Sequence, residues 1–372
     1  MPDPEFDRGR LLIKSLKERK NQISFPEKLI PLAFRPDNLR EDDKYLIGKT
    51  ASRIVNARKQ NRAVILAFGA HTIKNGLGSV LTELIRKGWV THLATNGAGI
   101  IHDWEFAYQG KSGENVKENV HNGEFGIWQE TGFYLNLALI TGAYEKLGYG
   151  ESIGKMISVE GLNIPEPAFL LKEASEKMEN YPEEASSAID LYDTIRKFNI
   201  RPGFMKIPHP YKKYSVQCAA YDLNIRFTGH PMIGHDIIYT HPANKGAAIG
   251  RTALTDFLYF ARSVSNIGNG VYLSVGSAVM SPMIFEKSLS MSQNIEIQNG
   301  GHISNHFMVI TDLTKNEWDW NKNGEPPPDN PAYYLRYCKT FSRMGGEMNY
   351  LSADNRDFLC ELYHRLMESD CD

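Results

Sequence analysis

The stretch AVILAFGAHTIKNGLGSVLTELIRKGWVTHLATNGAGIIHDWE, residues 63–105, decides the fold of this chain. Its opening apolar run, residues 63–68, is typical of a strand that is buried on both faces of a sheet. A helical stretch from Gly78 to Lys87 follows, and then a second apolar strand, residues 90–95, which ends in a cluster of small residues. A strand, a helix and a second strand in this order predict a parallel sheet.

The same alternation resumes further along the chain. We expect strands at 225–228, 271–275, 306–311 and 347–351, and helices at 42–60, 129–147, 252–263, 284–291, 332–341 and 355–367. The segment 150–215 is predicted to be mostly helical. The sequence therefore predicts an α/β protein with a Rossmann-like parallel sheet flanked by helices. We assign residues 63–372 to one such domain and residues 1–62 to an N-terminal helical extension.

Composition excludes several classes of protein. The 372 residues include 42 Lys and Arg against 44 Asp and Glu, so the chain has no positive excess with which to bind nucleic acid or an anionic membrane surface. No apolar run approaches the roughly 20 residues of a membrane span, and the first ten residues lack the apolar core of a secretory signal. The four cysteines show no CxxC spacing. We expect a cytoplasmic protein that binds neither nucleic acid nor membranes.

Glycines and polar residues follow the predicted strands at their carboxyl ends, where parallel sheets bind ligands. The loop after residues 63–68 contains four candidates for cofactor binding: His71, Thr72, Asn75 and Gly76. The loop after residues 90–95 contains Thr95, Asn96, Gly97, Ala98, His102 and Asp103. Glycine loops that enter helices suit phosphate binding, although neither loop is a GxGxxG or a Walker motif. The alternative is a pair of tight turns, with Asp103 acting as a helix cap.

Histidines and an aspartate are concentrated in a later segment, which contains His230, His235, Asp236 and His241. Imidazole and carboxylate groups suit zinc, iron or manganese, but the spacing matches neither HExxH nor the Asp-x-His-x-Asp pattern of binuclear hydrolases. Substrate binding or proton transfer by these side chains is the interpretation that we favour, so we expect no metal. Structural histidines at a subunit contact are a further alternative.

The order of these segments resembles the deoxyhypusine synthase family and its bacterial relatives. The likeness is clearest over residues 64–105 and extends over about residues 45–365. It implies a Rossmann-like fold that binds NAD, usually as a homotetramer with sites between subunits. It also implies that the cofactor contacts include Thr95, Asn96, Gly97, Ala98, Asp103, Gly276, Ser277, Asp312, Ala353 and Asp354. Lys339 lies at a position compatible with the lysine that forms the family's enzyme–imine intermediate.

Departures from the family pattern narrow the expected chemistry. Histidines at 230 and 235 replace acids that hold a polyamine in the family, and Arg336 adds a positive charge close to Lys339. We therefore expect an NAD-dependent transferase or oxidoreductase that acts on an amine-type or other small substrate through an imine, rather than authentic deoxyhypusine synthesis. In that scheme the catalytic residues are Lys339, His235 and His102, and the substrate contacts are His230 and Asp236. The alternatives are a nucleotide-binding protein without transfer chemistry and a metal-assisted hydrolase that uses the histidine cluster.

Overall fold

The computed structural model describes residues 5–369. Within these residues the main sheet has six strands: β2 (Val64–Phe68), β3 (His92–Asn96), β7 (Arg226–His230), β8 (Val271–Val275), β9 (Phe307–Asp312) and β10 (Glu347–Ser352). Every neighbouring pair is parallel, in the order β10-β9-β8-β2-β3-β7. Counted along the chain, this is the doubly wound order 3-2-1-4-5-6 of Rossmann folds. The predicted fold class is confirmed.

Strand β2 lies at the centre of the sheet because its residues are apolar on both faces. Val64 pairs with Val271 of β8, and Leu66 pairs with Leu93 of β3. All five residues of β2 are buried, as are all five of β8. Alternate side chains of β2 enter two separate cores, one on each side of the sheet.

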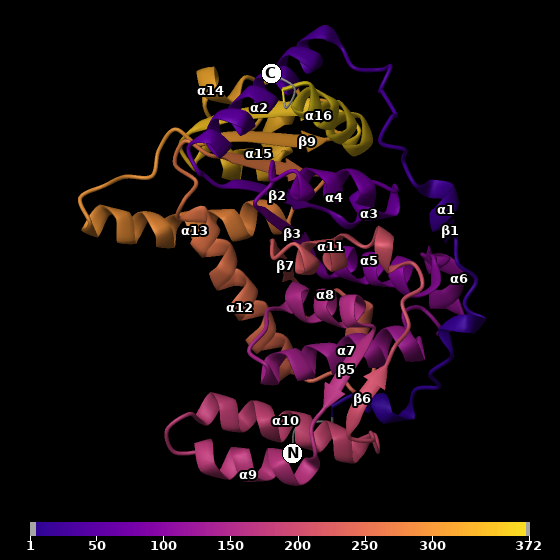
Figure 1. The fold of residues 1–372 in the computed structure, drawn as a ribbon. Coiled ribbons are helices and arrows are strands. Elements are labelled where there is room, and N and C mark those ends of the chain that lie inside the picture. Colours follow the sequence, from indigo (N-terminus) through magenta and orange to yellow (C-terminus); the bar gives the residue numbers. More distant parts are fainter. Residues whose placement is uncertain (1–4, 370–372) are drawn as a thin grey trace.

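Helices cover both faces of the sheet (Figure 1). The core that contains Val64, Leu66 and Phe68 includes side chains of α2 (Glu41–Lys59), α4 (Gly78–Arg86), α5 (Gly97–Gln109), α11 (Val216–Asp222) and α16 (Asn355–Ser369). The core that contains Ile65 and Ala67 includes side chains of α12 (Gly246–Val264), α13 (Met280–Gln298) and α15 (Arg336–Ser342). None of the described helices is both long enough and apolar enough to cross a membrane.

A mainly helical region extends past the β7 edge of the sheet, at the bottom of Figure 1. It contains α7 (Gln129–Tyr144), α8 (Tyr149–Val159), α9 (Pro167–Lys177) and α10 (Pro182–Lys197). It also contains two antiparallel strands, β5 (Gly161–Ile164) and β6 (Gly203–Lys206), which correct the prediction of a mostly helical segment. Three of the four residues of β6 are exposed, so no apolar run in the sequence marks this strand.

Short elements complete the described chain. They are β1 (Ile23–Ser24), α1 (Phe25–Lys28), α3 (Ala70–Lys74), β4 (Lys111–Ser112), α6 (Val116–His121), α14 (Trp320–Asn323) and five 3-10 turns, at Arg8–Arg10, Leu16–Glu18, Lys212–Tyr214, Ile237–Thr240 and Pro331–Tyr334. Strand β1 pairs with β4, which fastens the N-terminal segment to the residues that follow α5. Among the described residues before 63, α2 is the long helix, and the rest of that segment is β1, α1, two 3-10 turns and loop. The boundary at residue 62 stays a prediction.

Candidate cofactor and substrate site

The carboxyl ends of β2 and β8 form the point where the strand order reverses, which is where doubly wound sheets bind ligands. Gly69 follows β2 and Gly276 follows β8, and the amide of Gly69 donates to the carbonyl of Val275 at 3.0 Å. A Cβ atom on Gly69 would lie only 2.1 Å from the carbonyl oxygen of Gly276. The two loops therefore meet backbone to backbone, and a side chain at position 69 would separate them.

A cavity of about 230 Å³, here called the β9 cavity, opens on the β8–β10 side of this point. Its lining comes from the loops after β2, β8, β9 and β10: His71, Asn75, Gly276, Asp312, Leu313, Asp354 and Asn355. Asp312 accepts hydrogen bonds from Thr314 through Oδ1, and Asp354 accepts one from the amide of Arg356 through Oδ1. Within residues 5–369 the Oδ2 atoms accept no hydrogen bond, which leaves a free carboxylate oxygen on each side chain for hydroxyl donors.

Asn355 is a part of this cavity that the sequence analysis missed. Its side-chain amide donates to Thr72 Oγ1 at 3.3 Å. A Cβ atom on Gly276, whose φ is +57°, would lie 2.4 Å from the same amide nitrogen. Asn355 thus joins α3 to the loop after β8. In the sequence, its position directly after Asp354, a predicted cofactor residue, could have indicated it.

A second cavity, of about 200 Å³, lies beyond β3 and is here called the α5 cavity. Its polar lining is Arg19, Lys74, His102, Glu105, Glu114, His235 and Asp236, and its apolar lining includes Ala98, Ile101, Val116, Phe125 and Ile237. Helix α3 lies between the two cavities, because His71 lines the β9 cavity and Lys74 lines the α5 cavity. The crevice is therefore divided by a single turn of helix.

Asp236 is the carboxylate of the α5 cavity whose pKa lies close to neutral pH. Its carboxylate fills the space above Gly97, where a Cβ atom would lie 2.0 Å from Oδ2. Oδ2 is buried and accepts no hydrogen bond from the described part of the chain, residues 5–369. Burial without a compensating partner raises the pKa of Asp236 to about 7. The group can therefore take up or release a proton near neutral pH.

His102 is held by a chain of hydrogen bonds. Its Nδ1 lies 2.7 Å from Ser112 Oγ, and that hydroxyl donates to Glu105 Oε2 at 2.6 Å. Because the hydroxyl proton is used on Glu105, Ser112 accepts from Nδ1–H, and Nε2 of the neutral ring is left as an acceptor. Burial lowers the pKa of His102 to about 4, against the opposing charge of Glu105. The ring is therefore neutral at physiological pH.

Several predicted cofactor residues support the crevice without lining either cavity. Asp103 accepts from the Ser215 hydroxyl at 2.6 Å and from the amide of Val216 at 3.0 Å, so it caps the start of α11, and its cofactor role stays a prediction. The other residues make contacts that hold the backbone: Thr72 accepts from Asn355, and Thr95 donates to the Phe68 carbonyl. Asn96 caps α5, and Gly76 faces the Lys28 carbonyl at φ +82°. Ser277 accepts from the Ser281 amide, and the Ala353 amide donates to the Asp312 carbonyl.

The histidine cluster is dispersed in the structure. His230 Nε2 lies 2.9 Å from Thr228 Oγ1 and its ring packs edge-on against Phe260, so it is a core histidine rather than a lining residue. Burial lowers its pKa to about 3. His241 packs against two phenylalanine rings in another part of the molecule. Within residues 5–369 no group of three His, Cys, Asp or Glu side chains is arranged to hold a metal ion.

Lys339 is placed apart from the other two predicted catalytic residues. It lies on α15, where its ammonium pairs with Glu325 and sits 4.5 Å from the centre of the Tyr333 ring. His102 and His235 line the α5 cavity, and the lysine that joins them there is Lys74. The sequence analysis did not select Lys74, although its position three residues after His71, in the first glycine loop, could have indicated it as a site residue.

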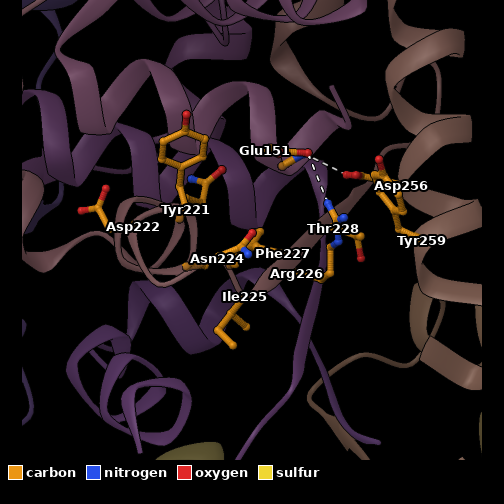
Figure 2. A pocket seen from close by; sticks show the side chains of 13 residues that line it. Glu151, Tyr221, Asp222, Asn224, Ile225, Arg226, Phe227, Thr228, Asp256 and Tyr259 are labelled. Carbon is orange, nitrogen blue, oxygen red and sulfur yellow. Dashed lines mark hydrogen bonds and ion pairs between the residues drawn. The ribbon is translucent and has the colours of Figure 1, made fainter. Parts of the chain in front are cut away.

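A further cavity, of about 440 Å³, lies beside the amino end of β7 and outside the crevice (Figure 2). On its wall the Arg226 guanidinium lies 3.5 Å from Glu151 and 3.9 Å from the centre of the Tyr259 ring. Asp256 accepts from the amides of Gly150 and Gly229, and burial raises its pKa to about 8. None of the residues predicted from sequence for the site lines this cavity.

Comparison with known proteins shows similarity of structure only. No protein-family model matches the chain, and no curated protein matches it in sequence. Among solved structures, AgrE in ternary complex with ornithine and NAD+ is 15% identical with a TM-score of 0.44, over 90% of this chain and 34% of that one. ArgZ, an arginine dihydrolase from the ornithine–ammonia cycle in cyanobacteria, is 15% identical with a TM-score of 0.39, over 89% of this chain and 33% of that one.

A third solved structure, a LOR/SDH protein from Methanococcus maripaludis S2, is 11% identical with a TM-score of 0.44, over 91% of this chain and 74% of that one. This chain spans about a third of the length of the ArgZ and AgrE chains. At these identities and scores, the similarity carries no conclusion about cofactor or substrate.

Proposed function

We propose that this protein is an NAD-dependent enzyme that oxidises a small amine-type substrate by hydride transfer. The observation that carries the proposal is the pair of cavities on either side of α3, at the point where the strand order reverses. Such a crevice accommodates a dinucleotide whose halves lie on opposite sides of the switch point. Deoxyhypusine synthesis is not part of the proposal, because the α5 cavity lacks a row of free carboxylates for a polyamine.

The residues present fit a dinucleotide. The β9 cavity would hold the adenosine half, with free oxygens of Asp312 and Asp354 directed to ribose hydroxyls. The close backbone approach of Gly69 and Gly276 joins the two loops at the switch point, over which the pyrophosphate would lie, and the nicotinamide would face the α5 cavity. NAD, when bound, accepts the hydride; the chain's own residues position the substrate and move protons.

In the α5 cavity the chain supplies an acceptor for the proton that leaves the amine. Asp236, whose pKa is about 7, can take up this proton, and the unprotonated Nε2 of His102 can accept a hydrogen bond from the substrate. The walls of isoleucine, valine and phenylalanine limit the access of water to an imine product. Lys339 takes no step in this scheme, since its ammonium is paired with Glu325 outside the cavity.

The proposal is tested by titrating NAD into the wild-type protein and into two variants of the β9 cavity, His71→Ala and Asp312→Asn, by calorimetry. We expect each variant to weaken NAD binding about tenfold, which corresponds to about 1.4 kcal/mol. Asp193→Asn, at an exposed site on α10, is the matched control. Equal NAD affinity in all four proteins would contradict the assignment of the β9 cavity.

Two further tests follow from the same scheme. A nucleotide-binding protein without transfer chemistry would bind NAD normally but never produce NADH from an amine, and NADH absorbance distinguishes the two functions.

The homotetramer expected from the family resemblance stays a prediction, which light scattering at micromolar concentration tests.

A further inference from the structure

The charged side chains of the α5 cavity fall into two groups, those already paired with protein and those that are not. Arg19 donates to both oxygens of Glu105 at 2.7 Å, in a bidentate pair that is almost fully buried. Glu114 accepts from Trp128 Nε1 at 3.0 Å and from the amide of Gly126 at 3.2 Å. These three charges are committed to the fold and are not available to a ligand.

Lys74 and Asp236 are the charged groups that remain. Lys74 is half-buried at the end of α3 and forms no ion pair or hydrogen bond with any residue in the range 5–369. Asp236 has the buried Oδ2 atom that accepts no hydrogen bond. Among the described residues the cavity thus presents one free cation and one free carboxylate. Lys74 belongs to α3, and Asp236 belongs to the loop after β7.

The rest of the wall is apolar. Ile101 and Ile237 line the cavity, and Val116 and Phe125 lie where the wall reaches solvent, with exposed fractions of 53% and 37%. At about 200 Å³ the cavity is smaller than the roughly 300–1,000 Å³ of sites for drug-sized ligands. A small ligand with one anionic group, one cationic group and an apolar remainder matches this lining.

We propose that the α5 cavity binds a zwitterionic α-amino acid with an apolar side chain, with its carboxylate at Lys74 and its amino group at Asp236. The inference rests on the proposed function and specifies the substrate class of the same site. It excludes a diamine or a basic amino acid, because Glu105 and Glu114 are occupied and a second ammonium would be buried without a partner.

The test uses the full chain saturated with NAD and compares L-valine with three probes by calorimetry. Isobutylamine lacks the carboxylate of valine, isovalerate lacks its amino group, and L-ornithine adds an ammonium to the side chain. We expect L-valine to bind at least about tenfold more tightly than each of the three, because each probe leaves one charge unmatched. Ornithine that binds as tightly as valine, or valine that does not bind at all, would overturn the inference.

Two variants assign the contacts. Lys74→Met should weaken valine at least about tenfold while leaving isobutylamine unchanged, and Asp236→Asn should weaken valine while leaving isovalerate unchanged. Lys59→Met, on an exposed position of α2, and Asp193→Asn are the matched controls. Valine affinity that is unchanged in both variants would also overturn the inference.

NAD titration without amino acid separates this inference from the proposed function. If NAD binds and valine does not, the substrate class is wrong and the cofactor assignment stands. If NAD does not bind to the wild-type protein, the proposed function itself is wrong. A cooperative thermal unfolding transition in Lys74→Met and Asp236→Asn shows that each variant is folded.

Discussion

The carboxylate of Asp236 occupies the space that a side chain at Gly97 would need, since a Cβ atom there would lie 2.0 Å from Oδ2 and 2.7 Å from Oδ1. Gly97 is the first residue of α5, directly after β3, and Asp236 lies in the loop that follows β7. The absence of a side chain at position 97 is therefore what allows the free carboxylate to reach the cavity.

Gly97→Ala should displace Asp236 and destabilise the protein by about 1–3 kcal/mol, the usual cost of overpacking a filled site. Urea denaturation measures the change in the free energy of unfolding. Gly250→Ala is the control, because this helical position has nothing within 4 Å of the added Cβ atom and should gain roughly 0.5–1 kcal/mol. A Gly97→Ala protein as stable as the wild type would show that Asp236 is not held where the structure places it.

Asp236→Asn should make unfolding stability less sensitive to pH. The pKa of Asp236 is about 7 in the folded protein, above the 3.8 of an unburied aspartate, so the folded state loses stability from this group as pH rises between these values. The variant removes that loss. We expect it to be more stable than the wild type at pH 8, on the order of 1 kcal/mol, and to show no gain at pH 4.

Thermal denaturation across this pH range, with exposed Asp193→Asn as control, measures the effect. The buried Asp256, whose pKa is also raised, is present in every protein and cancels in the comparison. An equal difference between Asp236→Asn and wild type at both pH values would contradict the raised pKa.

Arg19→Met should be one of the most destabilising single changes in the N-terminal segment. It would leave the buried carboxylate of Glu105 without its bidentate partner, a loss of about 3–5 kcal/mol. The double variant Arg19→Met with Glu105→Gln removes the orphaned charge and should recover part of the loss. Chemical denaturation of the two variants checks this order, and an equally unstable double variant would count against it.

Asp103→Ala should reduce stability without changing NAD affinity. The substitution removes the acceptor of the Ser215 hydroxyl and of the Val216 amide at the buried start of α11, which costs roughly 1–3 kcal/mol. Calorimetry at a temperature where the variant is folded separates the two effects. A folded variant with weakened NAD binding would support the cofactor role that the sequence predicted for this residue.

The main sheet could be predicted from sequence because its strands are continuous apolar runs between glycine loops. Val271–Val275 was placed without error, and the other strands were placed to within two residues. Strand β6 could not be found, because a short exposed strand is defined by its partner β5 and not by its own composition. Helix α12 begins well before the predicted residue 252, because its first turns are rich in glycine and alanine.

The site could be predicted only as far as strand ends. Reasoning from the carboxyl ends gave His71, which lines one cavity, and His102, which lines the other. Asp312 came from the family resemblance, and Asp236 came from the histidine-rich segment. Which way a side chain points is decided by packing: Asp103 is next to His102 in sequence but caps α11. Arg19 and Glu105 were missed because their proximity is created by the path of the N-terminal segment across α5. Lys74 was missed because α3 places it in the α5 cavity while His71, three residues earlier, lines the β9 cavity.

A single turn of helix, α3, contributes to both cavities. Substitutions at the adjacent positions of this turn therefore cannot affect one cavity without affecting the other. His71 and Asn75 meet the proposed cofactor, Lys74 lies between them and meets the proposed substrate, and the bond from Asn355 to Thr72 fixes the position of the whole turn. A mutation that adapts this turn to a different dinucleotide would also displace the cation that recognises the substrate. In the evolution of this protein, cofactor preference and substrate preference are expected to be inherited together.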